Sequence, residues 1–181
     1  MNARRIVKRT ETLVSPWVRL VANEVSTASS VNETYHAFAQ ADYVAIVARL
    51  ENGQLPIVRQ FRPAVGAETW ELPGGLLEPG ETAVIAAERE LLEETGAVAR
   101  QVVDLGTLFP DTGRLENHIR VFGIDASPAA ADFVPEAGMS VALVTPAELS
   151  EMIRDGVFNH MLHVGALAVA DAKGFRTGVF A

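Results

Sequence analysis

The sequence predicts an α/β fold in which a mixed β-sheet lies between helices, preceded by a small antiparallel β extension. Of the 181 residues 49% are hydrophobic, enough to bury a core. β-branched and aromatic segments alternate with turn signals along most of the chain. Helical patterns are confined to one segment in the middle and to one or two near the end, which favours an α/β/α sandwich.

The first forty residues predict short antiparallel strands. The segments RRIVKRTETLV, WVRLVANEVS and TYHAF carry β-branched and aromatic residues in partial alternation. They are separated by Ser15-Pro16 and by the polar stretch STASSVNET. Such a meander is too small to bury a core of its own. We therefore expect an N-terminal β extension at residues 1–40 and a main domain at residues 41–181.

Two further strands open the main domain. YVAIVARL, residues 43–50, is a nearly continuous apolar run, which is typical of a strand covered on both faces. The turn Glu51-Asn52-Gly53-Gln54 then leads into LPIVRQFR. Together these segments predict a β-hairpin.

The segment ETAVIAAERELLEETG predicts the central helix. Thr82 is suited to the N-cap, and Gly96 stands where helices often end in the left-handed conformation. Glu90 and Glu94 lie four residues apart on one helix face, and Glu93 borders the same surface.

The remaining elements follow from similar signals. VVDLGTLF, NHIRVFGIDA and SVALVT predict strands, and SPAAADFVPEAG predicts a loop before the last of them. Thr145, Pro146 and Glu148 form a helix start with an N-cap, a first-turn proline and a capping-box glutamate. HMLHVGALAVADA predicts a last helix that ends near Gly174.

Composition excludes several function classes. A net charge of −8 argues against a nucleic-acid binder, which needs an excess of Lys and Arg. The absence of cysteine excludes disulfides, a thiolate nucleophile and a cysteine-type zinc site. The sequence contains no apolar stretch of signal-peptide or membrane-span length. We therefore expect a soluble cytoplasmic protein with no nucleic-acid or membrane partner.

Six glutamates between Gly75 and Ala97 indicate a cation site. Like charges four residues apart weaken an isolated helix by a few tenths of a kcal/mol, so a compensating cation explains them economically. Mg²⁺ takes oxygen ligands and bridges carboxylates to substrate phosphates. A solvated face with ion pairs such as Arg89 to Glu93 is the alternative. The preceding Pro73-Gly74-Gly75 favours the metal site, because its carbonyls can reach a cation beside the helix.

The spacing of the charged and glycine residues resembles a known family. Gly75, Glu81, Arg89-Glu90-Leu91, Glu93-Glu94 and Gly96 fit the Nudix box, G-x(5)-E-x(7)-R-E-U-x-E-E-x-G-U, where U is a bulky aliphatic residue. Ala97 is smaller than the aliphatic residue usual at the last position. The resemblance implies a Nudix-type α/β/α sandwich that hydrolyses a pyrophosphate bond with Mg²⁺, for which Mn²⁺ can substitute.

The resemblance also implies a role for each residue of the box. The implied metal ligands are the Gly74 carbonyl, Glu90, Glu93 and Glu94, with Glu93 sharing a second metal. The residues with implied structural roles are Gly75, Glu81, Arg89 and Gly96. Within this set, Glu81 would support the metal cluster and Arg89 would orient the glutamates.

The resemblance covers about Val44 to Leu167 and narrows toward the branch that contains ADP-ribose pyrophosphatases. VRQFRPAV with ETWELPGGLLEPGE resembles that branch's strand and loop before the box, and LGTLFPDTGRLENHIRVFGIDA resembles its later loop, although Pro110 is slightly displaced. The implied substrate-binding residues are Arg59, Arg62, Trp70 and Glu116. Arginine suits this role because guanidinium pairs with phosphate bidentately. The alternative for both arginines is surface strand charge, with Arg62 pairing Glu68 or Glu71.

The general base is expected on the late loop. Members of the branch position the attacking water with a glutamate there, which implies Glu136 in this chain. The alternative is an ordinary exposed loop glutamate, in which case a box glutamate, first of all Glu93, takes the base role. We interpret His118, His160 and His163 as structural histidines.

The first hypothesis for function is Mg²⁺-dependent hydrolysis of ADP-ribose to AMP and ribose 5-phosphate. Another sugar nucleotide such as GDP-mannose, or a non-catalytic nucleotide sensor on the same scaffold, are the alternatives. In the resembling family the N-terminal extension exchanges between subunits and helps to form the nucleoside pocket. We therefore expect a homodimer that binds a small nucleoside diphosphate sugar.

Overall fold

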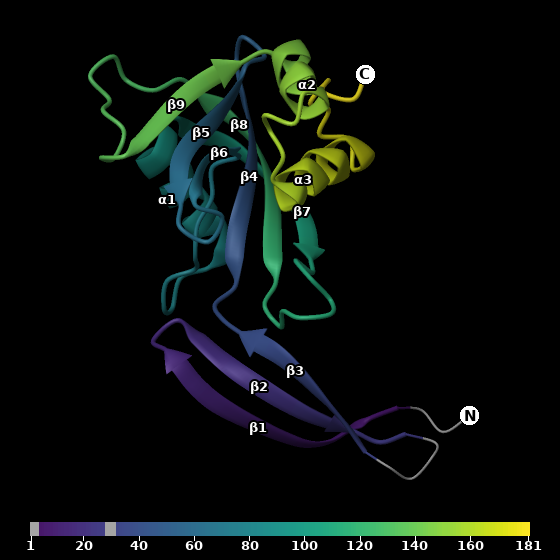
Figure 1. Cartoon of the computed structure of the whole chain (residues 1–181). Helices are drawn as coiled ribbons and strands as arrows, with labels where there is room; N and C mark the ends of the chain where they lie inside the picture. The colour runs from purple at the N-terminus through teal and green to yellow at the C-terminus, as the bar shows by residue number, and fades with distance from the viewer. Residues whose placement is uncertain (1–3, 28–31) are drawn as a thin grey trace. The chain divides into compact units, whose positions relative to one another are not determined.

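The computed structural model describes residues 4–27 and 32–181 (Figure 1). These residues form two compact units. The N-terminal unit comprises the chain up to Asp42 together with Phe109–His118, and the main unit comprises Tyr43–Leu108 and Ile119–Ala181. The segment at Phe109–His118 thus belongs with the N-terminal strands although it lies late in the sequence.

The N-terminal unit is the antiparallel meander that its β-branched segments predict. Its strands are β1 (Ile6–Ser15), β2 (Val18–Val25) and β3 (Glu33–Ala39), in the order β1-β2-β3. The late segment joins the edge at β3, where the Phe38 N–H donates to the Arg114 carbonyl at 2.7 Å and the Glu116 N–H donates to the Phe38 carbonyl at 3.1 Å.

The main unit contains two three-stranded sheets. The first has the order β4 (Tyr43–Leu50), β8 (Ile119–Ser127) and β7 (Val98–Leu108); β4 runs parallel to β8, and β7 runs antiparallel to it. The second has the order β6 (Ala67–Glu71), β5 (Leu55–Arg62) and β9 (Met139–Val144), and is antiparallel throughout. The first sheet is therefore the mixed sheet that the sequence predicts.

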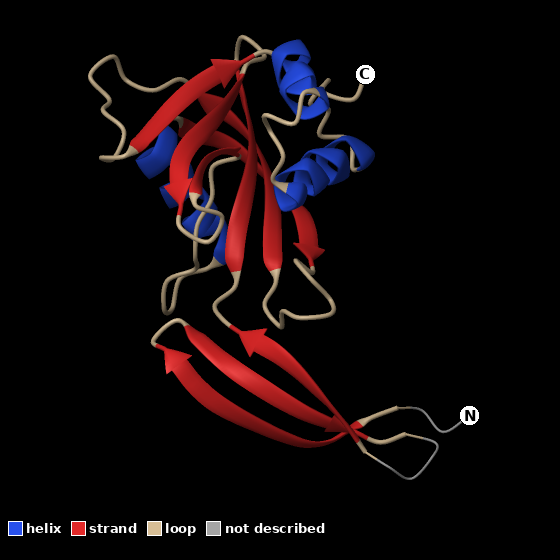
Figure 2. Cartoon of the chain, in the orientation of Figure 1, coloured by secondary structure: helices blue, strands red, loops and turns tan. Residues whose placement is uncertain are grey.

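Helices cover both faces of these strands, as the blue helices on either side of the red strands show in Figure 2. They are α1 (Ala83–Thr95), α2 (Pro146–Arg154) and α3 (Met161–Ala172). Strand β4 alternates between two cores: Val44 and Ile46 pack in the core with Leu91 of α1, whereas Ala45 and Val47 pack in the core that includes α2 and α3. This confirms the α/β/α sandwich.

The predicted hairpin at residues 43–62 is wrong. The turn itself forms, with Gly53 at φ 81° and the Leu50 N–H bonded to the Gln54 carbonyl at 2.9 Å. However, β4 pairs along its whole length with β8, and β5 pairs with β6 and β9. The turn residues reverse the chain but do not decide whether the flanking strands share a sheet. Both strands are rich in buried residues, and they find their partners elsewhere.

The caps of α1 form as predicted. The Thr82 side chain accepts from the Ile85 N–H, and Gly96 has φ 70° with its N–H bonded to the Leu92 carbonyl. A Cβ at Gly96 would also lie 2.4 Å from the Phe133 ring. Ala97, the departure from the box pattern, is buried in the same core as α1, so the position keeps its apolar packing role.

The capping box of α2 is also confirmed, with Thr145 and Glu148 bonding reciprocally at the helix start. None of the helices in the described ranges is long and apolar enough to cross a membrane.

Candidate active site

Helix α1 holds two box glutamates against the loop that precedes it. Ala86, Ala87 and Leu91 bury one face of α1 in its core, which turns the neighbouring face toward residues 73–75. There the Glu94 carboxylate accepts from the Gly74 N–H at 2.9 Å and is only 8% exposed. Glu94 is thus a buried acid with a fixed orientation.

The loop at residues 73–75 is tied to β4 on both sides of Gly74. The Ile46 N–H donates to the Pro73 carbonyl and the Val44 N–H donates to the Gly75 carbonyl, each at 2.9 Å. No backbone hydrogen bond within the described ranges ends on the Gly74 carbonyl. That oxygen is therefore free to accept a cation or a donor, as a metal ligand must be.

Both glycines of the loop are required by close approach. A Cβ at Gly74 would lie 2.2 Å from the Val44 carbonyl oxygen. A Cβ at Gly75 would lie 2.1 Å from the Glu90 carboxylate. The glycine that opens the Nudix box therefore makes room for the carboxylate of a predicted metal ligand.

Burial disfavours the charged forms of the two glutamates. It raises the pKa of Glu94 to about 7, an effect that the Gly74 N–H opposes and the Glu90 charge reinforces. Burial also raises the pKa of Glu90. The buried Glu94, the partly buried Glu90 and the Gly74 carbonyl all offer oxygen atoms, the donor type that a hard divalent cation such as Mg²⁺ takes.

Arg89 joins three of the box glutamates. Its guanidinium donates to Glu81 at 2.9 and 3.0 Å, to Glu90 at 2.9 Å and to Glu93 at 3.0 Å. These hydrogen bonds lower the pKa of Glu81. The ion pair of Arg89 with Glu93, considered as an alternative to a metal site, thus exists beside the Glu90 and Glu94 pair. One guanidinium serves these three carboxylates and Glu94 adds a fourth that it does not reach, so acids remain in excess.

Arg62 forms the ion pair with Glu71 that the sequence offered as an alternative to phosphate binding. Arg62 donates from Nε and one Nη to the two Glu71 oxygens at 2.7 and 2.6 Å, and the Thr69 hydroxyl adds a bond at 2.6 Å. Glu71 is only 1% exposed. Although burial opposes it, these partners lower the pKa of Glu71. The second Nη of Arg62 has no hydrogen-bond partner among the described residues.

Arg59 and Trp70 contact each other rather than the box. The Arg59 guanidinium pairs with Glu68 and lies 5.9 Å from the centre of the Trp70 ring. Trp70 packs, partly buried, against the core that includes α2 and α3.

A cavity of about 210 Å³ lies beside the glycine loop. It is lined by Tyr43, Val44, Arg62, Glu71, Gly74, Gly75, Leu76, His160 and His163. The free Gly74 carbonyl and the Arg62 guanidinium therefore belong to one concave site.

The two acids predicted outside the box are Glu116 and Glu136. Glu116 belongs to the N-terminal unit, where Arg9 holds its carboxylate at 2.5 and 2.8 Å and lowers its pKa. Glu136 is exposed in the loop between β8 and β9, and only its carbonyl takes part in a hydrogen bond, with the Met139 N–H at 3.0 Å.

Four polar residues of the cavity were not identified as site residues from the sequence: Tyr43, Glu71, His160 and His163. Glu71 was considered only as a partner of Arg62, and His160 and His163 were interpreted as structural. The available signals were the position of Glu71 just before Leu72-Pro73-Gly74 and the three-residue spacing of the histidines. Neither signal predicts that β6 and the start of α3 meet at the same cavity.

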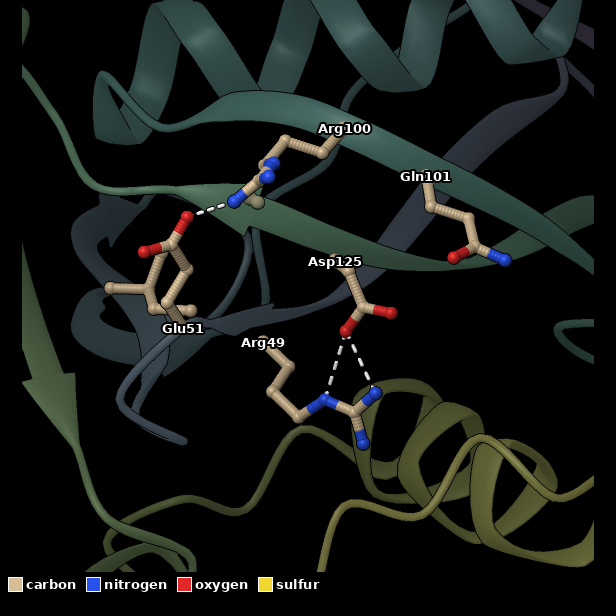
Figure 3. A pocket seen from close by; sticks show the side chains of 7 residues that line it. Arg49, Glu51, Arg100, Gln101 and Asp125 are labelled. Carbon is tan, nitrogen blue, oxygen red and sulfur yellow. Dashed lines mark hydrogen bonds and ion pairs between the residues drawn. The ribbon is translucent and has the colours of Figure 1, made fainter.

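A second pocket in the main unit, of about 440 Å³, does not compete for the role of active site (Figure 3). Arg49 pairs with Asp125 at 2.7 Å, and Arg100 pairs with Glu51. Its charged side chains neutralise one another, and none of its lining residues belongs to the box.

The raised pKa of Glu94 makes stability depend on pH. In metal-free buffer the folded state holds the Glu94 proton up to a pKa of about 7, whereas the unfolded chain releases it near 4.5. Glu94 therefore makes its whole contribution to the free energy of unfolding below pH 4.5. As the pH rises from there through 7, about 3 kcal/mol of this free energy is lost. Urea unfolding at both ends of this window measures the loss.

The variant Glu94→Gln should lose less stability than the parent across this window, because its amide carries no titrating proton and still offers an oxygen to the Gly74 N–H. Glu88→Gln, an exposed glutamate on the same helix, is the matched control and should behave like the parent. Equal losses in the parent and in Glu94→Gln would contradict the prediction.

Comparisons with known proteins agree with this geometry. Residues 39–160 match the NUDIX domain. ADP-ribose pyrophosphatase of Mycobacterium tuberculosis is 36% identical over 141 residues, which cover 73% of this chain and 67% of that protein. The CMP-5'-(N-acetyl-N-hydroxy-3-aminopropyl)phosphonate hydrolase of Streptomyces rubellomurinus is 31% identical over 145 residues, which cover 78% of this chain and 70% of that protein.

The fold is shared with a solved structure. The crystal structure of an ADP compounds hydrolase matches with a TM-score of 0.78, covering 96% of this chain and 97% of that chain at 18% identity. Together with the intact box at Gly75–Ala97, the NUDIX domain match shows that the chain belongs to the Nudix hydrolase family, as an enzyme similar to the ADP-ribose pyrophosphatases.

Proposed function

We propose that this enzyme hydrolyses the pyrophosphate bond of a nucleoside diphosphate sugar with Mg²⁺, and that ADP-ribose is its substrate, giving AMP and ribose 5-phosphate. The observation that carries the proposal is that the buried Glu94 and the partly buried Glu90 lie against the backbone of Gly74 and Gly75, two residues that also line a cavity with Arg62. This arrangement puts carboxylates for a cation beside a guanidinium for a phosphate.

The donor set fits the cation. Glu90, Glu94 and the Gly74 carbonyl would hold one Mg²⁺, or Mn²⁺ in its place, and Glu93 would share a second ion. When bound, the cation would neutralise phosphate charge and acidify water. Because burial already raises the pKa values of Glu90 and Glu94, the site is short of positive charge without it.

The protein's own side chains position these ligands. The Gly74 N–H fixes one oxygen of Glu94, and Arg89 fixes Glu90 while it binds Glu81. Hydrogen bonds of this kind, from neighbouring groups to the metal ligands, typically tune the affinity and activity of metal sites. In this proposal Arg89 is a positioning residue and does not contact substrate.

Arg62 is the proposed phosphate contact in the cavity. Its bonds to Glu71 hold the guanidinium in place and leave the second Nη for a phosphate oxygen. Arg59 and Trp70, which contact each other, would then bind the substrate outside this cavity.

The choice of ADP-ribose is supported by the relatives. The Mycobacterium tuberculosis protein is named an ADP-ribose pyrophosphatase, and so is a Bacillus subtilis relative that is 34% identical over 79 residues. The Streptomyces relative acts by its name on a CMP-linked phosphonate, so related chains differ in nucleobase and in the group beyond the phosphorus.

Glu136 is proposed as the general base. Its exposed carboxylate has no hydrogen bond or ion pair with any described residue, so it is free to meet the attacking water once substrate is bound. If Glu136 does not act, the role passes to Glu93, which is half-exposed and pairs only with Arg89 in the described ranges.

The N-terminal unit is proposed to mediate a homodimer. Its exposed large hydrophobic residues are Ile6, Val7, Leu13, Val14, Trp17, Tyr35, Phe38 and Phe109. Exposed apolar surface on this scale is typical of an interaction site. The same unit carries a hollow of about 740 Å³ lined in part by Tyr35 and Glu116, which suits a contribution to the nucleoside pocket.

A substrate panel with Mg²⁺ tests the proposed reaction. ADP-ribose should be cleaved to AMP and ribose 5-phosphate faster than GDP-mannose or nucleoside triphosphates, as measured by phosphate release after phosphatase treatment. EDTA should abolish the reaction. Turnover of triphosphates alone, or tight ADP-ribose binding without turnover, would contradict the proposal.

Two isosteric variants test the assigned roles. Glu94→Gln should lower kcat by about a hundredfold or more, since loss of a ligand exceeds the roughly 10- to 100-fold effect of losing a ligand's neighbour. Glu136→Gln should lower kcat by about 10²-fold or more with KM little changed, as expected for a general base. An unchanged rate in Glu136→Gln would move the base role to Glu93; an unchanged rate in Glu94→Gln would refute the metal site.

The oligomeric state tests the role of the N-terminal unit. Light scattering should give twice the chain mass of 19.4 kDa at micromolar concentration. Trp17→Glu, at an exposed aromatic residue between β1 and β2, should weaken the dimer, whereas Gln101→Glu in the main unit should not. A clean monomer mass for the parent would refute the proposal.

A further inference from the structure

The cavity beside the glycine loop contains more polar groups than the proposed diphosphate chemistry uses. Besides Arg62 and the glycines, Tyr43, Glu71, His160 and His163 reach it from β4, from the end of β6 and from the start of α3. Its volume of about 210 Å³ is below the range of about 300 Å³ and upward that holds a whole drug-sized ligand. It can therefore hold only part of a nucleoside diphosphate sugar.

His163 is a neutral donor in a fixed orientation. Its Nδ1 accepts from the Leu72 N–H at 3.0 Å, so the ring proton resides on Nε2. The side chain is 5% exposed, and burial lowers its pKa to about 3. No hydrogen bond to Nε2 is formed within the described ranges, and the residue lines the cavity.

His160 presents a nitrogen that lacks a partner. Its ring stacks on His163 with the ring centres 4.0 Å apart and the planes 19° from parallel. Although His160 is the N-cap of α3, its side chain makes no cap hydrogen bond. Its Nδ1 is buried and unpaired among the described residues, which is uncommon for a buried polar atom and points to a ligand.

Glu71 and Tyr43 complete the polar wall. A Glu71 oxygen and one nitrogen of each histidine lie within 4.8 Å of one another. Tyr43 keeps its proton, because burial raises its pKa to about 12, and its hydroxyl has no hydrogen bond to a described residue. The wall thus combines neutral donors, an unpaired imidazole nitrogen and a carboxylate already bound by Arg62.

We infer that His160 and His163, with Tyr43 and Glu71, form a subsite for neighbouring hydroxyl groups of the sugar in the substrate. The inference rests on the proposed function, and it assigns the cavity to the sugar side of the pyrophosphate. Hydroxyls both donate and accept, as this wall requires. A phosphate would gain no charge from the neutral His163 imidazole and would face the Glu71 carboxylate.

A cation at the same three side chains is disfavoured by their geometry. A metal needs lone pairs that converge on one point, but the Nδ1 lone pair of His163 already accepts from the Leu72 N–H and its Nε2 carries the ring proton. The Glu71 oxygens also already accept three hydrogen bonds, two of them from the Arg62 cation. A protonated Nε2 on His163 and a carboxylate already bound by Arg62 suit hydroxyl groups better than an ion.

Direct binding tests the subsite without catalysis. The chain has four histidines, and the other two, His36 and His118, lie in the N-terminal unit. On titration of the metal-free protein with ribose 5-phosphate, the side-chain NMR signals of His160 and His163 should shift while the other two stay. His160→Phe, which keeps a ring for stacking, identifies the signals.

Inorganic phosphate and Zn²⁺, each alone, are the control probes. Neither should reproduce the shifts. Equal shifts with inorganic phosphate, or tight Zn²⁺ binding that His160→Phe abolishes, would overturn the sugar subsite, as would ribose 5-phosphate shifts confined to His36 and His118.

Kinetics test the role in specificity. His160→Phe and Tyr43→Phe should each raise KM for ADP-ribose about three- to tenfold, the effect of one lost hydrogen bond. They should leave KM unchanged for the methyl ester of ADP, which keeps the ribose of adenosine but lacks the second ribose, beyond the pyrophosphate. Gln101→Phe, a polar-to-aromatic change on β7, is the control and should change neither value.

The two proposals fail in different ways. Equal KM increases for both substrates would refute the sugar subsite and leave the proposed reaction intact. If the parent cleaves neither substrate, the proposed function fails, and the histidine shifts with ribose 5-phosphate still decide whether the cavity binds a sugar.

Discussion

The site depends on the close approach of the Gly74-Gly75 backbone to β4 on one side and to α1 on the other. With β4 so near, no side chain fits at Gly74, and with the Glu90 carboxylate so near, none fits at Gly75. The backbone is thus the wall against which Glu90 and Glu94 are buried. Burial raises the pKa values of both glutamates, because it destabilises their charged forms. The fold supplies too little positive charge nearby to offset this effect.

Arg89 partly offsets that need and shapes the rest of the box. By bonding Glu81, Glu90 and Glu93 together, it restricts three of the box glutamates without reaching Glu94. The acid that binds the backbone N–H of Gly74 instead, Glu94, is also the buried one among the box glutamates. In the proposed metal site, binding strength and folding stability would therefore be set against each other at Glu94, a trade-off that is common at functional sites.

The sequence predicted local features well because they are encoded in nearby residues. Thr82 and Gly96 bound α1, and Thr145 with Glu148 begins α2, since caps depend on residues within one turn. The error at residues 43–62 has the opposite origin. The turn at Gly53 is local, but the pairing of β4 with β8 joins residues some 75 positions apart, and no turn signal carries that information.

The same distinction applies to the site. The box glutamates could be located by spacing alone, because they share one helix. Glu71 and His163 could not, because β6 and α3 are brought together only by the packing of the main core. From the sequence, the partner of Arg62 could be Glu68 or Glu71. Burial decides between them, because the carboxylate of the buried Glu71 is shielded from water and needs Arg62, whereas the exposed Glu68 pairs with Arg59.

The ties of the glycine loop to β4 have a consequence for dynamics. Many substrate-binding loops open independently of the core, because few buried hydrogen bonds hold them. Here the Val44 and Ile46 amides that hold the loop belong to a strand packed in both cores of the main unit. Releasing the loop would leave these two amides at the edge of β4 without their partners, so this wall of the site is tied to the strand, and the two amides should exchange slowly with solvent.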